Sequence, residues 1–164
     1  MTPELFYAGL TWDDYAASMQ VNRELLRRKC REFTLPEGER GRWANSPIAH
    51  VLVFTEDWCQ DSISALPPLL ALHATTLFDL RVLRRSEALE LQRALTGQLF
   101  PPVPMFVFYD NHWQERGRFV EMPRAFRRLK TDPAEALWLK EMYDEMWWET
   151  ELAEFAIMVD HDGE

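Results

Sequence analysis

The sequence predicts an α/β protein in which one mixed central sheet is covered by helices on both faces. Residues 48–55 form a nearly continuous apolar run, which is typical of a central strand that is buried on both sides. Apolar side chains recur at near-helical spacing in residues 12–33, before that run, and a second helix is expected after it, over residues 59–73. Residues 105–109 and 115–121 are strand-like and are separated by a short polar turn, which predicts a hairpin. The expected order is βαβ followed by ββα, with extra helices at both ends.

The length and composition of the chain fit one domain. Its 164 residues are 47% hydrophobic, which is enough to build one sizeable core. Within this domain we expect an N-terminal helical extension and loop over residues 1–47. The sheet-containing core should span residues 48–122, and C-terminal helices should follow over residues 123–164.

Charge and composition argue against two classes of partner. The net charge of −9 disfavours binding to a phosphate backbone, and the arginine-rich residues 23–31 and 124–130 are interleaved with apolar residues as in solvated helix faces. No apolar run approaches the ~20 residues that a membrane-spanning helix needs. The first ten residues lack the basic and apolar regions of a secretory signal. We therefore expect a cytoplasmic protein with no nucleic-acid or membrane partner.

The cysteines and histidines are few and scattered. Two cysteines, Cys30 and Cys59, and four histidines form neither a disulfide scaffold nor a zinc pattern. We expect no metal and no other cofactor. Cys30 falls on or near the apolar face of a predicted helix, where a free cysteine behaves as a small hydrophobic side chain. Its expected role is therefore structural.

Prolines, glycines and one asparagine predict where the early helices end. Residues 35–47 are rich in these types and indicate a loop. Asn22 interrupts the helical periodicity of residues 12–33, which leaves one bent helix or two short helices open. Pro67 and Pro68 lie inside the helix after the central strand, and a proline removes a backbone hydrogen bond there, so we expect a kink or a break.

Capping residues divide the second half of the chain. A strand is expected at residues 80–83, followed by a helix that Ser86 caps and Gly97 closes. Pro123 begins a long helical region that is interrupted near residues 131–133.

The residues after the central strand carry the candidate chemistry. The strand ends, a short acidic turn follows, and Trp58-Cys59 opens the next helix. A thiol at a helix N-terminus lies near unpaired backbone N–H groups and the positive end of the helix dipole, which both favour a thiolate. Ser62 stands three residues later, so the motif is C-x-x-S. Pro67 follows Cys59 by eight residues and Pro104 follows it by forty-five.

This arrangement resembles the thioredoxin superfamily. In that family the reactive cysteine begins a helix, a proline bends this helix, and a cis-proline lies beside the sulfur; Cys59, Pro67 and Pro104 occupy these positions. The resemblance implies that the Val103–Pro104 bond is cis and that the backbone of Val103 orients an extended substrate segment. It also implies that Trp58 offers a partner an apolar contact. The likeness covers nearly the whole chain.

The chain also resembles a branch of small bacterial thioredoxin-like proteins whose active site reads Glu-x-Trp-Cys-Gly-Asp. Residues 56–61 match this pattern except for Gln60. Two departures from ordinary thioredoxin affect the chemistry. Val53 stands where thioredoxin has a buried aspartate that assists proton transfer, and Ser62 replaces the resolving cysteine. Because the second thiol normally resolves the mixed disulfide, self-contained turnover is lost.

We expect the Cys59 thiol to be less reactive than the thiol of an ordinary thioredoxin. A hydrogen bond from the Ser62 hydroxyl would favour the thiolate, whereas Glu56, Asp57 and Asp61 place negative charge nearby and disfavour it. No lysine or arginine is close in sequence to offset these acids. An acid in a first helical turn also stabilises the helix, which is an alternative role for Asp61.

Three functions are compatible with these residues. The first is a monothiol thioredoxin-like protein, in which Cys59 exchanges with protein thiols or disulfides and an external low-molecular-weight thiol resolves the mixed disulfide. The alternative is a non-catalytic thioredoxin-fold binding module with a vestigial active site. In a weaker third interpretation, Cys59 is a redox sensor that forms a disulfide with Cys30.

The C-terminal residues 138–155 are rich in aromatic and methionine side chains. A helix that is apolar around much of its circumference has to be buried, so packing on the sheet is the first explanation. A homodimer interface or a groove for a partner peptide is the second, because large exposed apolar patches mark such sites.

Overall fold

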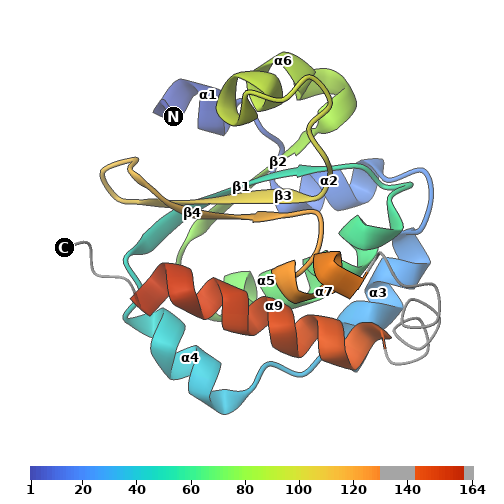
Figure 1. Cartoon of the computed structure of the whole chain (residues 1–164), viewed down its shortest axis with the longest axis vertical. Helices are drawn as coiled ribbons and strands as arrows, with labels where there is room; N and C mark the ends of the chain where they lie inside the picture. The colour runs from blue at the N-terminus through green and yellow to red at the C-terminus, as the bar shows by residue number, and fades with distance from the viewer. Residues whose placement is uncertain (130–142, 161–164) are drawn as a thin grey trace.

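A computed structural model describes residues 1–129 and 143–160 of the chain. Within these residues, four strands form one sheet in the order β2-β1-β3-β4 (Figure 1). The strands are β1 Ile48–Thr55, β2 Asp79–Arg84, β3 Met105–Asp110 and β4 Glu115–Val120. β1 runs parallel to β2 and antiparallel to β3, and β3 pairs with β4 as an antiparallel hairpin. The predicted α/β class, with its mixed sheet, is confirmed.

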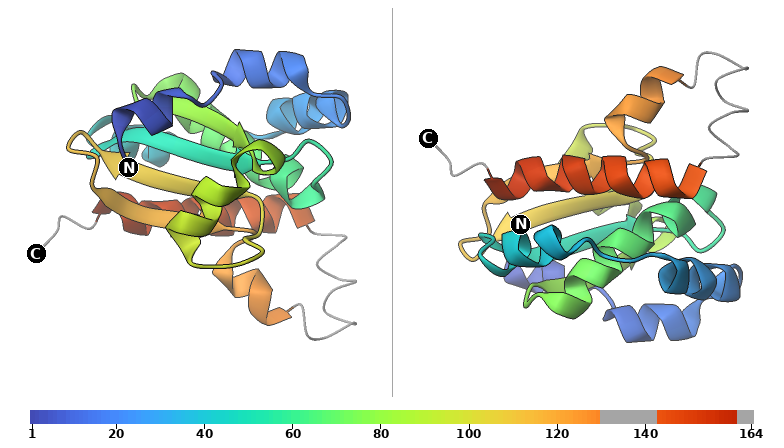
Figure 2. Two further views of the ribbon diagram at one scale, coloured as in Figure 1. Left: turned by 90° about the horizontal axis from the view of Figure 1, so that it is seen from above. Right: turned by 90° about the horizontal axis from the view of Figure 1, so that it is seen from below.

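Helices lie on both faces of this sheet, as the views from above and below show (Figure 2). One face carries α2 Trp12–Ser18, α3 Arg23–Glu32, α4 Glu37–Ala44, α5 Gln60–Thr75, α7 Arg124–Leu129 and α9 Tyr143–Asp160. The other face carries α1 Pro3–Tyr7 and α6 Arg85–Thr96. The helices on the first face belong to the larger apolar cluster of the molecule.

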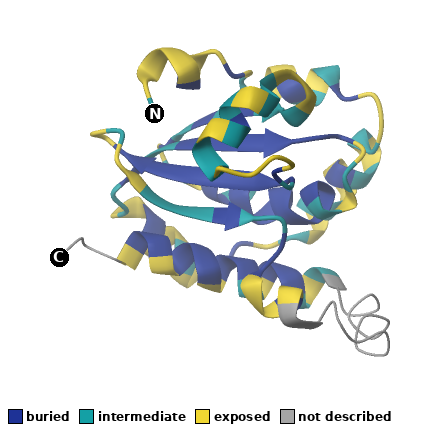
Figure 3. Ribbon diagram, turned by 45° about the horizontal axis from the view of Figure 1, so that its top comes forward, coloured by how far each residue is buried: buried dark blue, intermediate teal, exposed yellow. Residues whose placement is uncertain are grey.

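The central strand β1 contributes to both apolar clusters. Val51 and Val53 pack in the larger cluster, and Leu52 and Phe54 pack in the smaller one. All four side chains are fully buried, and much of the sheet ribbon is coloured as buried in Figure 3. Successive side chains of a strand point to opposite faces, so a continuous apolar run is what a strand between two helical layers requires.

The N-terminal extension contains two separate helices, α2 and α3. Thr11 caps α2, because its hydroxyl accepts a hydrogen bond from the backbone N–H of Asp14 at 3.2 Å. Asn22 precedes α3 with a left-handed φ of 59°, a conformation that asparagine tolerates better than most residues. Its side-chain amide donates to the backbone carbonyl of Asp57 at 2.8 Å. Asn22 therefore precedes the start of α3 and attaches the extension to the turn before Cys59.

The prediction of a loop over residues 35–47 is wrong for most of that segment, because α4 occupies it. Pro36 stands just before the helix, where a missing backbone N–H does no harm. Trp43 is 3% exposed and belongs to the larger apolar cluster. Burial of this one large ring outweighs the poor helix propensity of Gly38 and Gly41.

The expected break at Pro67-Pro68 does not occur, and α5 continues through both prolines. Pro68 has no N–H to donate to the carbonyl of Ser64, its partner four residues earlier. The indole N–H of Trp148 donates to that carbonyl instead, at 2.8 Å. A side chain from α9 thus replaces a hydrogen bond that the proline removes.

The helix predicted after Ser86 differs from the structure at its start and agrees with it at its end. The helix expected after Ser86 begins earlier, at Arg85, and its N-cap, Arg84, makes no side-chain capping bond. Gly97 closes this helix with a left-handed φ of 68°, as predicted. The expected interruption near residues 131–133 lies outside the described residues. None of the helices in the described ranges is long and apolar enough to cross a membrane.

Candidate active site

Cys59 is the N-cap residue of α5, at the end of the turn that leaves β1. Its backbone N–H donates to the carbonyl of Glu56 at 3.2 Å, and its own carbonyl accepts from Ile63 at 3.1 Å. The residue is half-buried, and it forms no disulfide. The helix therefore starts at the cysteine, where the free N–H groups of the first turn favour a negative charge.

A backbone turn before β3 lies beside the Cys59 sulfur. The Val103–Pro104 bond is cis, as the resemblance implied. The thiol donates a hydrogen bond to the carbonyl of Val103, with 3.6 Å between Sγ and the oxygen. This acceptor lies within reach of any group that approaches the sulfur. An extended substrate segment would have to compete with the thiol for it.

Ser62 does not act on the sulfur as expected. The residue is fully buried, and its hydroxyl oxygen has no hydrogen-bond partner. The Cys59 thiol instead hydrogen-bonds to Val103. The predicted hydrogen bond from Ser62 to the sulfur is therefore absent from the structure. The site presents one sulfur, with a buried hydroxyl where a resolving thiol would lie.

The two acids before Cys59 are nearly buried, and each carboxylate accepts a hydrogen bond from a backbone N–H. Glu56 and Asp57 are 5% and 6% exposed. Glu56 accepts from the backbone N–H of Ser86 at 2.7 Å, and Asp57 accepts from the backbone N–H of Gln20 at 2.7 Å. These bonds attach the turn to α6 on one side and to the N-terminal extension on the other.

A basic side chain that is distant in the sequence lies close to both of these acids. The Arg84 guanidinium is 3.9 Å from the Glu56 carboxylate and 3.7 Å from the Asp57 carboxylate. It also donates to the hydroxyl of Ser18 at 2.9 Å and lies over the ring of Tyr15. The expectation that no basic residue offsets the acids is therefore wrong. Their effect on a thiolate at Cys59 is partly cancelled.

The parallel pairing of β1 and β2 explains how Arg84 reaches the site. Thr55 and Arg84 are paired in the sheet register and end their respective strands. The carboxyl ends of neighbouring parallel strands lie at the same edge of a sheet, so the residues that follow Thr55 meet Arg84. The signal was present in the sequence as the pair Arg84-Arg85, which directly follows the strand predicted over residues 80–83.

Exposed apolar side chains lie on the segments that frame the thiol. Trp58 is 55% exposed, and the guanidinium of Arg85 lies 5.6 Å from its ring centre. Arg85 also donates to the carbonyl of Pro101 at 3.5 Å, which connects Trp58 with the segment before the cis-proline. Leu99 and Phe100, just before Pro101, are 66% and 79% exposed.

The other predicted residues have supporting positions. Asp61 is half-buried in the first turn of α5, where a negative charge stabilises the helix. Pro67 is buried within the same helix. His50 lies near the start of β1, away from Cys59, with its ring stacked on Trp113 at 3.9 Å; burial lowers its pKa. Within the described ranges, no group of three or more metal-ligating side chains could hold a metal ion.

Comparisons with known proteins agree with this architecture. A family-level profile described as thioredoxin matches residues 9–136. The chain belongs to this thioredoxin family. The match includes the C-x-x-S motif, the cis-proline and the whole sheet.

Two solved structures share the thioredoxin-like fold of the chain. One is a protein of unknown function from Pseudomonas aeruginosa, with a TM-score of 0.76 and 20% identity over 96% of this chain and 95% of that one. The other is an HIV epitope-scaffold, with a TM-score of 0.77 and 18% identity over 96% of each chain. No curated protein matches the chain. At these identities the likeness shows the fold alone.

Proposed function

We propose that this thioredoxin-family protein carries out thiol–disulfide exchange through Cys59 alone, with an external thiol completing each cycle. The observation that carries the proposal is the position of the sulfur. Cys59 begins α5, is half-exposed, and lies 3.6 Å from the carbonyl that precedes cis-Pro104. A nucleophile for a disulfide needs access, a favoured thiolate and a fixed approach for the substrate.

The exchange proceeds in three balanced steps. The Cys59 thiolate attacks one sulfur of a substrate disulfide, forms a mixed disulfide and expels the other substrate sulfur as a thiolate, which takes up a proton. A low-molecular-weight thiolate then attacks the Cys59 sulfur and releases the second substrate thiol. A second external thiol frees Cys59. One substrate disulfide is reduced, and two external thiols are oxidised to their disulfide.

The surroundings of the sulfur favour a protein disulfide as the substrate. Trp58 directly precedes Cys59, Phe100 lies three residues before the Val103 carbonyl, and both are exposed, a combination that suits an extended peptide with apolar side chains. The pairing of Glu56 and Asp57 with Arg84 lessens the repulsion that these acids would exert on a thiolate.

Paired cysteine variants test the proposal. Reduction of a fluorogenic peptide disulfide is measured with glutathione as the external thiol. We expect Cys59→Ser to abolish the protein-dependent rate, and Cys30→Ser to keep it within about twofold of the wild type. A Cys59→Ser variant as active as the wild type would overturn the proposal.

The non-catalytic binding module is the second candidate. The buried, unpartnered Ser62 hydroxyl favours it, because nothing near the sulfur completes an exchange. In that case partners would be retained by Cys59→Ser and lost when Trp58 and Phe100 are changed to serine. Reductant-sensitive covalent capture at Cys59 would contradict it.

A further inference from the structure

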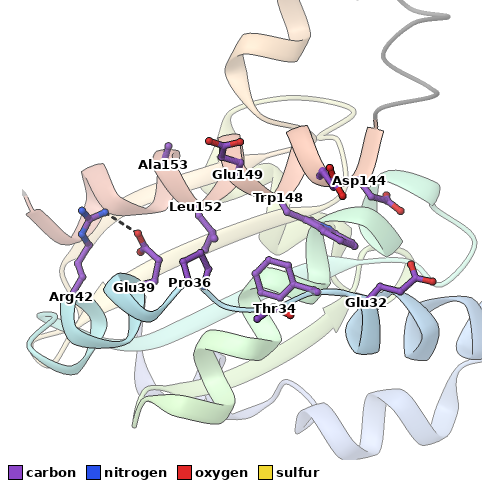
Figure 4. A pocket seen from close by; sticks show the side chains of 12 residues that line it. Glu32, Thr34, Pro36, Glu39, Arg42, Asp144, Trp148, Glu149, Leu152 and Ala153 are labelled. Carbon is purple, nitrogen blue, oxygen red and sulfur yellow. Dashed lines mark hydrogen bonds and ion pairs between the residues drawn. The ribbon is translucent and has the colours of Figure 1, made fainter.

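A second concave surface lies on the face of the molecule formed by α9 and α4. The groove has a volume of about 850 Å³ and runs between α9 and the segment from the end of α3 to α4 (Figure 4). We call it the α4–α9 groove. Its apolar wall consists of Phe33, Pro36, Trp148 and Leu152. A volume of this size is typical of surfaces that bind a ligand.

The apolar wall of the groove is held in place by fixed contacts. Trp148 is 7% exposed, and its indole N–H donates to the Ser64 carbonyl that Pro68 leaves free. Phe33 packs against the Trp148 ring edge-to-face, with 5.4 Å between the ring centres. Leu152, one helical turn further along α9, is 5% exposed. The groove is therefore formed before any ligand arrives.

The rim of the groove is acidic. Among the described residues that line it, five are acidic and one, Arg42, is basic: the acids are Glu32, Glu39, Asp144, Glu145 and Glu149. Arg42 is held by the carboxylate of Glu39 at 3.2 Å. Asp144 binds Lys29 at 2.6 Å, and the Glu32 carboxylate lies 3.7 Å from the Arg28 guanidinium. Glu145 and Glu149 are exposed to solvent. The opening consequently carries an excess of negative charge.

The length of the groove fits a chain better than a compact molecule. Its lining residues on α9 run from Asp144 to Ala153, which corresponds to about 14 Å of helix. Glu32 and Asp144 lie at one end of the groove, Glu149 lies further along α9, and Glu39 at the other end is paired with Arg42 (Figure 4). One small cation would meet one end of this row, whereas a peptide with several basic residues would meet all of it.

We propose that the α4–α9 groove binds a basic peptide segment of a partner protein. Apolar side chains of the segment lie on Trp148 and Leu152, and its lysine or arginine side chains face Glu145 and Glu149. This is the mode in which an amphipathic segment occupies an apolar groove. A second copy of the chain fits less well, because a protein with a net charge of −9 would oppose acidic surface to acidic surface.

Three designed peptides of about 12 residues, long enough for three helical turns, test the proposal by calorimetry. The first contains leucine and lysine, the second replaces lysine by glutamate, and the third replaces leucine by serine. We expect saturable one-to-one binding of the first alone, with an affinity that falls as salt is raised. Equal binding of the first and third peptides would overturn the apolar part of the proposal, and equal binding of the first two would overturn the ionic part.

Matched charge-reversal variants test whether the peptide binds in the α4–α9 groove. Glu145→Lys with Glu149→Lys should weaken the lysine peptide at least about tenfold. The control, Glu87→Lys with Glu90→Lys, makes the same charge change on α6, on the other face of the sheet, and should leave affinity within about twofold. Equal losses in both variants, or a peptide-free dimer that buries the groove, would contradict the proposal. Cys59→Ser should bind the peptide normally, so this test is independent of the exchange activity.

Discussion

The two cysteines of the chain have similar exposure and opposite chemical settings. Both are free and half-buried. Cys59 begins a helix and its thiol reaches the carbonyl of Val103, whereas Cys30 lies within α3 and packs against the larger apolar cluster. Burial raises the pKa of the Cys30 thiol to about 11, and the nearby charge of Arg31 only partly opposes this. The two thiols therefore differ in their surroundings: Cys59 lies at the backbone N–H groups of a helix start, whereas Cys30 lies against an apolar cluster whose burial disfavours its thiolate.

The same comparison bears on a sensor disulfide between the two residues. Cys30 packs against the larger apolar cluster and Cys59 against the smaller one. These clusters lie on opposite faces of β1. A disulfide needs its two Cα atoms within about 7 Å, so this arrangement favours two separate roles.

The largest expected effect is on the alkylation of Cys30. At pH 8, a rise in pKa from 9.0 to about 11 lowers the thiolate fraction from roughly a tenth to about a thousandth. Iodoacetamide should therefore label Cys30 about 100-fold more slowly in the folded protein than in urea, and the folded rate should rise with pH up to about 11. Mass spectrometry of the Cys59→Ser variant measures both rates. Equal rates in the folded and the unfolded protein would show that burial does not suppress the thiolate of Cys30.

The second prediction concerns the cation near Cys59. Arg84→Met leaves Glu56 and Asp57 nearly buried without their shared cation, so we expect the free energy of unfolding to fall by about 3–5 kcal/mol. Alkylation of Cys59 should also slow, because the remaining negative charge disfavours the thiolate. Denaturant unfolding and labelling kinetics measure the two effects.

A neighbouring arginine supplies the control. Arg81 faces Asp79 at 3.5 Å on the same strand, with side chains that are 21% and 35% exposed. Because solvent screens such a pair, Arg81→Met should lower stability by less than about 1 kcal/mol and leave Cys59 labelling unchanged. Similar losses of stability and of Cys59 labelling rate in both variants would show that Arg84 does not act through Glu56 and Asp57.

The smallest expected effect concerns the helix that carries Cys59. Trp148→Phe keeps a ring against Phe33 but leaves the Ser64 carbonyl without the indole donor, which should cost about 1–3 kcal/mol. Trp43→Phe is the matched control, because the Trp43 indole nitrogen is buried with no hydrogen-bond partner. Its loss should be smaller in thermal or denaturant unfolding. Equal losses would mean that the bond to Ser64 does not support α5.

The sequence contained the parts of the fold and site that depend on local patterns. The apolar run of β1, the position of Cys59 at a helix start and the left-handed Gly97 each follow from neighbouring residues. The pairing of Arg84 with Glu56 requires the parallel register of two strands.

Long-range contacts also explain why the predicted break at Pro67-Pro68 and most of the loop predicted over residues 35–47 are absent. The continuity of α5 through Pro68 depends on Trp148, which lies 84 residues from Ser64 in the sequence. α4 forms because Trp43 reaches a core built from distant elements. Proline and glycine rules describe the isolated chain, and tertiary partners override them at both places.

Replacing Ser62 by cysteine tests whether the missing second thiol is what prevents resolution within the chain. Ser62→Cys would supply a second thiol in the same helical turn as Cys59, so a mixed disulfide could be resolved within the chain. The mixed disulfide between Cys59 and a peptide should live at least about tenfold shorter in this variant than in the wild type, because an intramolecular thiol has a high effective concentration. Acid quenching followed by non-reducing gel analysis measures this lifetime. An unchanged lifetime would mean that the wild-type serine is not what stops intramolecular resolution.

Trapping the mixed disulfide tests exchange through Cys59 most directly. The reduced protein is mixed with a peptide disulfide, quenched in acid and mapped by mass spectrometry without reductant. We expect the peptide on Cys59 and its release when glutathione is added, with Cys30 unmodified. A protein that forms no adduct at Cys59, or that joins Cys59 to Cys30, would contradict exchange through a single sulfur.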